Sequence, residues 1–146
     1  MHHPPGTCIP SDQLTFAGFK TPEASLETLA WCMMHGTYDE ANQCLSPALL
    51  AGELSDPRRR EQFPEKQKHV LGLLKSFQIV AKKVLSDDKV ELKKRVEADP
   101  IPGQRPGSPF GIETMVKIGD EWKLGGGSRV CGLTWEEEGE IQKFVP

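Results

Sequence analysis

The chain has 146 residues and a formal net charge of −3, with 37% hydrophobic and 27% charged residues. This length indicates a single domain that can bury a hydrophobic core. No apolar run approaches the roughly 20 residues that a membrane-spanning helix requires, so no membrane span is predicted within this chain.

The first twenty residues are rich in Pro, Gly and Thr and show no hydrophobic periodicity. They also lack the apolar stretch of a signal peptide. Residues 1–18 are therefore predicted to be a flexible N-terminal segment. The folded domain is expected to cover residues 19–131, and residues 132–146 form an acidic C-terminal tail.

A first helix is predicted to begin at Thr21, because threonine is a good N-cap and Pro22 suits the first helical position. The apolar residues that follow have the helical spacing i, i+3, i+4, i+7: Leu26, Leu29, Ala30 and Met33. Gly36 is expected to end the helix. Trp31 lies off this apolar stripe, so it needs a second surface to pack on or it faces an opening.

Three further helical segments are predicted before residue 77. Thr37 and Glu40 have the spacing of a capping box and open a short helix. Ser46-Pro47 opens a helical turn, and Asp56-Pro57 repeats this cap-and-proline signal for a longer helix. The apolar stripe of the longer helix comprises Phe63, Val70, Leu74 and Phe77. Pro64 is expected to bend or restart that helix.

From residue 77 the apolar period changes from 3.6 to 2, which predicts two antiparallel hairpins. The first hairpin turns at Asp87-Asp88 and has one apolar and one polar face. The inward face of the next strand is predicted to comprise Phe110, Ile112, Thr114, Val116 and Ile118. A three-residue turn at 119–121 keeps Trp122 on that face. Helices followed by hairpins predict an α+β fold, with N-terminal helices packed on a curled antiparallel sheet.

Several short segments share their order and spacing with a known family. They are Thr21-Pro22-Glu23-Ala24, His35-Gly36-Thr37-Tyr38, Leu45-Ser46-Pro47, Phe77-Gln78-Ile79-Val80, 84–90 and 116–124. Over about residues 19–126 the chain resembles the nuclear-transport-factor-two-like (cystatin-like cone) superfamily, and in particular its bacterial domains of unassigned function.

This resemblance implies a cone-like α+β barrel with a cavity between the helices and the sheet. It implies no single activity, because members include isomerases, dehydratases, binding proteins and structural adaptors. A homodimer formed through the sheet is a further implication. The resemblance also favours an exported or membrane-tethered bacterial protein whose anchor is absent from this chain.

Two lysines on the first hairpin are the main candidates for ligand binding. The turn at Asp87-Asp88 places Lys83 opposite Leu92 and Lys94 opposite Ala81, so the lysines are diagonal neighbours on the apolar face. Two ammonium groups there require water or an anion. We expect either a binding point for a small anionic ligand, such as a carboxylate, or long stems that carry both charges to the rim.

Three aromatic residues, Trp31, Tyr38 and Trp122, either line the mouth of the same pocket or belong to the core. His35 and Asp39 are the candidates for a catalytic pair, although His35 also suits the negative end of the first helix dipole. The chain has one tyrosine. Enzymes of the resembled family tend to pair an Asp or His with tyrosines, which argues against isomerase-like chemistry here.

The cysteines are Cys8, Cys32, Cys44 and Cys131, and none forms a C-x-x-C pair. No zinc site is therefore predicted, and no other metal or cofactor motif is present. Cys32 and Cys44 lie beside helical stripes and are expected to be buried thiols, with a disulfide between them as the alternative.

Residues 58–95 carry twelve Lys or Arg against five Asp or Glu. A solvated basic face is expected there rather than a nucleic-acid surface, because interleaved aromatic residues are missing. The chain as a whole is predicted to bind a small anionic or apolar ligand, or a protein partner, through its cone or open sheet face. The alternatives are a small lyase or isomerase and a module that binds polyanions through residues 58–95.

Overall fold

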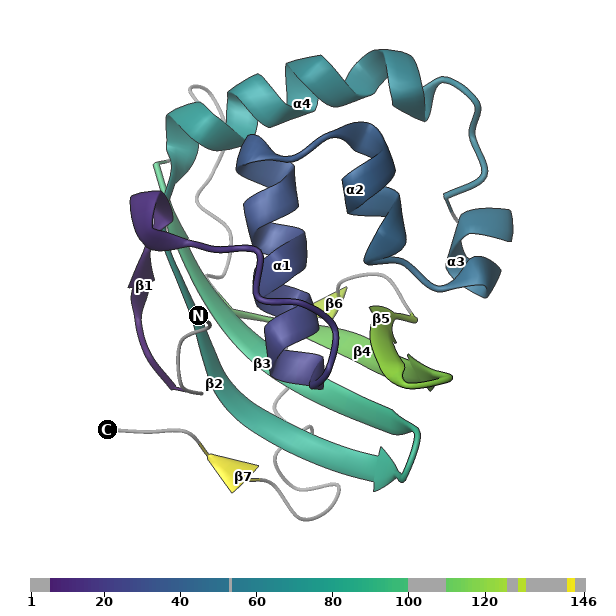
Figure 1. The fold of residues 1–146 in the computed structure, drawn as a ribbon. Helices are drawn as coiled ribbons and strands as arrows, with labels where there is room; N and C mark the ends of the chain where they lie inside the picture. Colours follow the sequence, from purple (N-terminus) through teal and green to yellow (C-terminus); the bar gives the residue numbers. More distant parts are fainter. Residues whose placement is uncertain (1–5, 53, 100–109, 126–128, 131–141, 144–146) are drawn as a thin grey trace.

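The computed structural model describes residues 6–52, 54–99, 110–125, 129–130 and 142–143. In this part of the chain, helices pack on one face of a curled antiparallel sheet, which confirms the predicted α+β class (Figure 1). The helices are η1 (Ser11–Gln13), a 3-10 turn, and α1 (Pro22–His35), α2 (Tyr38–Gln43), α3 (Pro47–Ala51) and α4 (Arg59–Leu73). The strands are β1 (Ile9–Pro10), β2 (Leu74–Ser86), β3 (Lys89–Ala98), β4 (Phe110–Ile118), β5 (Glu121–Leu124), β6 (Arg129–Val130) and β7 (Gln142–Lys143).

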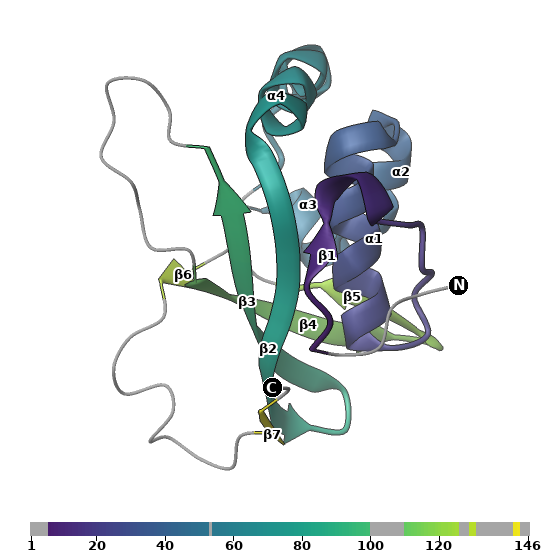
Figure 2. The same cartoon turned by 90° about the vertical axis from the view of Figure 1, so that its left-hand side faces the viewer.

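The strands follow the order β1-β2-β3-β4-β5, while β7 pairs with β2 and β6 pairs with β4. Figure 2 shows β2 and β3 bending along their length, with the helices on one side of the sheet. The pairing of β2 with β3 shifts register three times, and such bulges bend a strand and increase its twist. Among the described residues, no helix has the length and apolar character needed to cross a membrane.

Three of the predicted helix starts are confirmed by their caps. Thr21 Oγ1 accepts a hydrogen bond from the Ala24 backbone N–H at 3.0 Å, and Ser46 caps α3 in the same way. Thr37 and Glu40 form the complete capping box at the start of α2. These caps are local hydrogen bonds between residues three apart, so the sequence alone specifies them.

The predicted start of the long helix at Asp56-Pro57 is wrong. Asp56 Oδ1 accepts from the Arg58 backbone N–H at 2.9 Å, which closes a turn there, and α4 begins only at Arg59. The helix continues through Pro64 and ends at Leu73. The strand β2 begins at the next residue, so the predicted helical stripe extended too far into the sheet.

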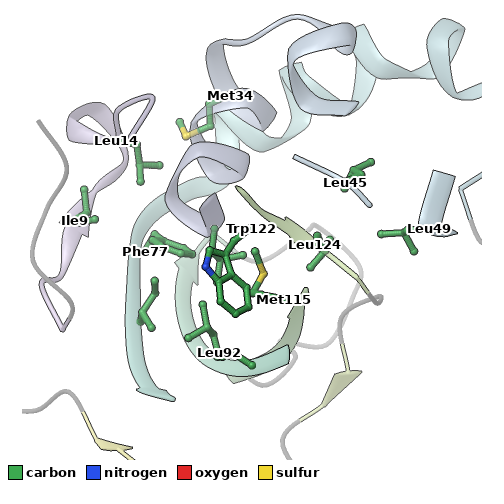
Figure 3. Packing of buried hydrophobic residues seen from close by; sticks show 13 residues of the cluster. Ile9, Leu14, Met34, Leu45, Leu49, Phe77, Leu92, Met115, Trp122 and Leu124 are labelled. Atoms are coloured by element: carbon green, nitrogen blue, oxygen red, sulfur yellow. The ribbon is translucent and has the colours of Figure 1, made fainter. Parts of the chain in front are cut away.

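The main hydrophobic core fills the hollow of the sheet beneath α1 (Figure 3). Its buried members include Phe77, Leu92, Met115, Trp122 and Leu124. Helix α1 is also buried on its other sides, because a second cluster containing Cys32, Cys44 and Phe63 packs between α1, α2 and α4. The helix is therefore the centre of the fold rather than a half-exposed cover.

Part of the N-terminal segment, expected to be flexible over residues 1–18, packs on the domain. Ile9 pairs with Phe77 of β2, and Ile9 and Leu14 are both buried in the main core. The Glu27 carboxylate accepts hydrogen bonds from the backbone N–H and the hydroxyl of Thr15, at 3.1 and 2.7 Å. Residues 9–15 thus extend the sheet and cover α1.

The predicted inward face of β4 is wrong. Met115 lies opposite Val90, and both belong to the core, whereas Ile112 lies opposite Lys93 on the face away from the helices. Ile112 and Met115 are each 0% exposed. Because both faces of this strand are covered, apolar alternation does not identify the inner one.

The turn between β4 and β5 is also shorter than predicted. Ile118 pairs with Glu121, which leaves the two-residue turn Gly119-Asp120, and Gly119 has a φ of 63°. Two-residue hairpin turns need positive φ angles, which glycine adopts without strain. Trp122 consequently pairs with Lys117, and its ring still reaches the core because it shares a face with Met115 and Leu124.

Candidate functional site

A cavity of about 320 Å³ lies between α1, α4 and the paired strands β2 and β3. Helix α1 lines it with the predicted stripe of Leu26, Leu29, Ala30 and Met33. The other lining residues are His69, Val70, Leu73, Leu74, Phe77, Lys94, Val96 and Ala98. Only Lys94 and His69 bring polar side-chain atoms to this lining, so the cavity is suited to an apolar molecule.

Lys94 forms an ion pair at this cavity. Its Nζ lies 2.9 Å from Glu113 Oε1, and the side chains of Lys94 and Glu113 are 26% and 4% exposed. Lys94 lies opposite Gly111 on β4, and Glu113 lies opposite Leu92 on β3, so the pair is diagonal on the face that carries the core. A buried carboxylate requires such a partner. The pair is neutral as a unit.

The predicted proximity of Lys83 and Lys94 is wrong. The register shift between Ile79 and Ala81 places Lys94 opposite Ile79 and Lys83 opposite Glu91. Since side chains alternate along a strand, Lys83 and Lys94 lie on opposite faces of the sheet. Lys83 is 4% exposed on the face away from the helices, and the two lysines do not form one anion site.

Lys82 takes the inward position that Lys83 was predicted to occupy. Its Nζ lies 2.9 Å from Glu23 Oε1 in the first turn of α1. This acid also suits the positive end of the helix dipole. The contact ties the N-terminus of α1 to β2.

The three predicted aromatic residues do not belong to the cavity lining. The Trp31 ring meets Phe16 edge to face at 5.8 Å, which is the second packing surface that its position required. Tyr38 packs against Phe63 at 5.7 Å. Trp122 is buried in the core. These side chains stabilise the fold around the helices rather than shaping a pocket mouth.

His35 and Asp39 are not brought together. His35 is exposed at the end of α1, 6.3 Å from the Trp31 ring. Asp39 is exposed and accepts a hydrogen bond from Arg60 Nη2 at 3.0 Å. Neither residue lines the cavity, so its apolar interior does not contain this acid–base pair.

Sequence reasoning missed two polar residues of the site. His69 precedes Leu73 by four positions on α4, and this helical spacing places both on the cavity side. Glu113 falls outside the predicted inward face of β4, which comprises the even-numbered residues from Phe110 to Ile118. Its significance appears only once β3 brings Lys94 alongside it.

No protein-family model, curated protein or solved structure significantly matches this chain. The geometry of the cavity is therefore the basis for proposing what the domain binds.

Proposed function

We propose that the domain binds a small, uncharged and mainly apolar ligand in the cavity between α1, α4, β2 and β3. The observation that carries this proposal is the apolar lining of the cavity, in which the charge of Lys94 is paired with Glu113. Ligand pockets usually measure about 300–1,000 Å³, so a cavity of about 320 Å³ suits a small molecule. The resemblance to nuclear-transport-factor-two-like domains supports a binding cavity at this place.

The charge of the pair favours a neutral ligand over the anionic one expected from two lysines. The Glu113 carboxylate already neutralises Lys94. A ligand anion brought to Lys94 would also approach that carboxylate, and repulsion between them is strong where water is scarce. An ammonium has three N–H donors. A ligand carbonyl or hydroxyl can accept from one of them without displacing Glu113.

The test compares three molecules with the same carbon chain: 2-octanone, 1-octanol and octanoate. Isothermal titration at pH 7 is expected to show binding of the ketone and the alcohol, with octanoate at least tenfold weaker. Equal or tighter binding of octanoate would contradict an uncharged ligand. Failure of all three to bind would contradict the ligand-binding role.

Cavity-filling variants locate the binding site. Ala30→Leu and Val70→Phe enlarge side chains that line the cavity, so each is expected to reduce ketone binding at least tenfold. Leu71→Phe is the matched control for Val70→Phe, because Leu71 is exposed on the same helix, α4, and is not part of the cavity lining. Unchanged binding in both filled variants would place the ligand elsewhere.

Membership of the nuclear-transport-factor-two-like superfamily, and a homodimer formed through the sheet, stay predictions. The mass of the protein in solution checks the dimer. The lyase or isomerase alternative gains no support from the positions of His35 and Asp39, both of which lie outside the cavity lining.

A further inference from the structure

Two cysteines lie in contact inside the second hydrophobic cluster. Cys32 Sγ and Cys44 Sγ are 3.9 Å apart, and both residues are 0% exposed. Cys32 lies near the end of α1, and Cys44 is the C-cap of α2. Both are free thiols. They pack with Phe19, Ala41 and Phe63, and neither cysteine lines the cavity, although Leu29 and Met33 of its lining pack against the same cluster.

We propose that Cys32 and Cys44 form a reversible disulfide that fastens α1 to α2, with hydrogen peroxide as the oxidant. A disulfide requires an S–S distance of about 2.05 Å, so the sulfurs must approach each other by about 1.9 Å. Both residues lie at or near helix ends, where a side-chain rotation and a small backbone shift supply this movement. The proposal does not depend on the ligand.

The chemistry balances without any bound cofactor. The Cys32 thiolate attacks one peroxide oxygen, the O–O bond breaks, and a sulfenic acid and hydroxide form. Cys44 sulfur then attacks Cys32 sulfur, the S–O bond breaks, and the thiol proton leaves with the hydroxyl as water. Two thiols and one peroxide give one disulfide and two waters, so both sulfurs are oxidised and both peroxide oxygens are reduced.

The environment distinguishes the two thiols. The hydrogen bond between Cys32 and Cys44 lowers the pKa of Cys32, against the opposing effects of burial and the Glu40 carboxylate. The same hydrogen bond, together with burial, raises the pKa of Cys44. Cys44 Sγ also donates a hydrogen bond to the Glu40 carbonyl at 3.6 Å, which favours its protonated form. Since the thiolate is the nucleophile, Cys32 is expected to be oxidised first, when local opening of the α1–α2 contact admits peroxide to the buried sulfur, and Cys44 to resolve the sulfenic acid.

Peptide mapping of the full chain tests the bond directly. Trypsin leaves both cysteines in one peptide, residues 21–58, because no Lys or Arg lies between Thr21 and Pro57. After treatment with hydrogen peroxide this peptide is expected to lose 2 Da, to resist alkylation and to recover both properties on reduction. A further cleavage after Glu40 should leave its two halves linked. Disulfides from Cys32 or Cys44 to Cys8 or Cys131 instead would overturn the proposal.

Variants test the order of the steps. In Cys44→Ser the Cys32 sulfenic acid should persist and react with a dimedone-type trap, whereas Cys32→Ser should give no trapped Cys44. Cys8→Ser is the matched control, because Cys8 is exposed and takes no part in the proposed disulfide. This variant should still show the 2 Da loss. The oxidised protein should melt roughly 5–10 °C higher than the reduced one. Trapping of a Cys44 sulfenic acid in Cys32→Ser would contradict the proposed order of oxidation. An unchanged melting temperature after complete oxidation would contradict the proposal that the disulfide fastens α1 to α2.

Discussion

The ammonium of Lys94 on β3 lies 2.9 Å from the carboxylate of Glu113 on the neighbouring strand β4. The two side chains meet on the face of the sheet that carries the core, and Lys94 also lines the cavity. This contact is the one ion pair among the described residues that combines a cavity-lining cation with an almost fully buried acid. It connects the stability of the sheet to the chemistry of the site.

Lys94→Met is expected to destabilise the protein by about 2–3 kcal/mol, because it leaves the Glu113 carboxylate buried without its ammonium. Removing one partner of a fully buried ion pair typically costs about 3–5 kcal/mol. The loss expected here is smaller, since the Lys94 side chain is partly exposed. The double variant Lys94→Met/Glu113→Leu should recover most of this loss, because it removes both charges. Urea unfolding measures both values, and a double variant less stable than the single one would contradict this account.

A second prediction concerns the contact between α1 and β5. Ser25 is 0% exposed, and its Oγ donates a hydrogen bond to the Trp122 backbone carbonyl at 2.7 Å. Ser25→Ala leaves that carbonyl without this donor, so a loss of about 1–2 kcal/mol is expected.

The matched control for Ser25 is Ser55. Its Oγ donates to the Gly52 carbonyl at 2.8 Å, but the contact is exposed and water can replace it. Ser55→Ala should therefore change the free energy of unfolding by less than about 0.5 kcal/mol. Equal losses in the two variants would show that burial of the Ser25 hydrogen bond has no special weight.

A third prediction concerns the N-terminal segment. Glu27 is buried and accepts two hydrogen bonds from Thr15. Glu27→Ala should cost about 2 kcal/mol and accelerate amide exchange at residues 9–17, because this segment loses two of its hydrogen bonds to α1. The exposed Glu65 provides the control, and Glu65→Ala should change neither quantity. Unchanged exchange at residues 9–17 in Glu27→Ala would contradict the proposed attachment.

Two glycines are predicted to respond in opposite directions to alanine. A Cβ on Gly36 would lie 2.8 Å from the Cys32 Cα, so Gly36→Ala should destabilise by roughly 1–2 kcal/mol. A Cβ on Gly72 would meet nothing within 4 Å, and this residue lies in helix α4. Gly72→Ala should therefore stabilise by about 0.5–1 kcal/mol. Thermal unfolding of the two variants compares them, and changes of the same sign would be inconsistent with these contacts.

The starts of α1, α2 and α3 and the α1 wall of the cavity could be predicted from sequence because their signals are local. Thr21, Thr37 and Ser46 cap residues only three positions away. The stripe of α1 follows helical spacing and lines the cavity as a unit. Such interactions need no knowledge of distant parts of the chain.

The polar part of the site could not be predicted, because it depends on strand register. The register shift after Ile79 moves Lys83 away from Lys94, and the alternation of residues gives no sign of it. The face of β4 was misassigned because Ile112 and Met115 are equally buried on opposite sides. Glu113 becomes a plausible inner residue only when Lys94 is known to lie beside it.

Because β4 buries apolar side chains on both faces, its apolar residues do not by themselves fix its register relative to β3. If β4 slid by one residue along β3, Ile112 would move to the core face and Met115 to the outer face. This exchange would cost little hydrophobic free energy, since both faces already bury apolar side chains. The same slide would turn Glu113 away from Lys94 and leave the Lys94 ammonium without this carboxylate on the core face. We expect the Lys94–Glu113 ion pair to select the native register of β3 and β4 when the sheet forms.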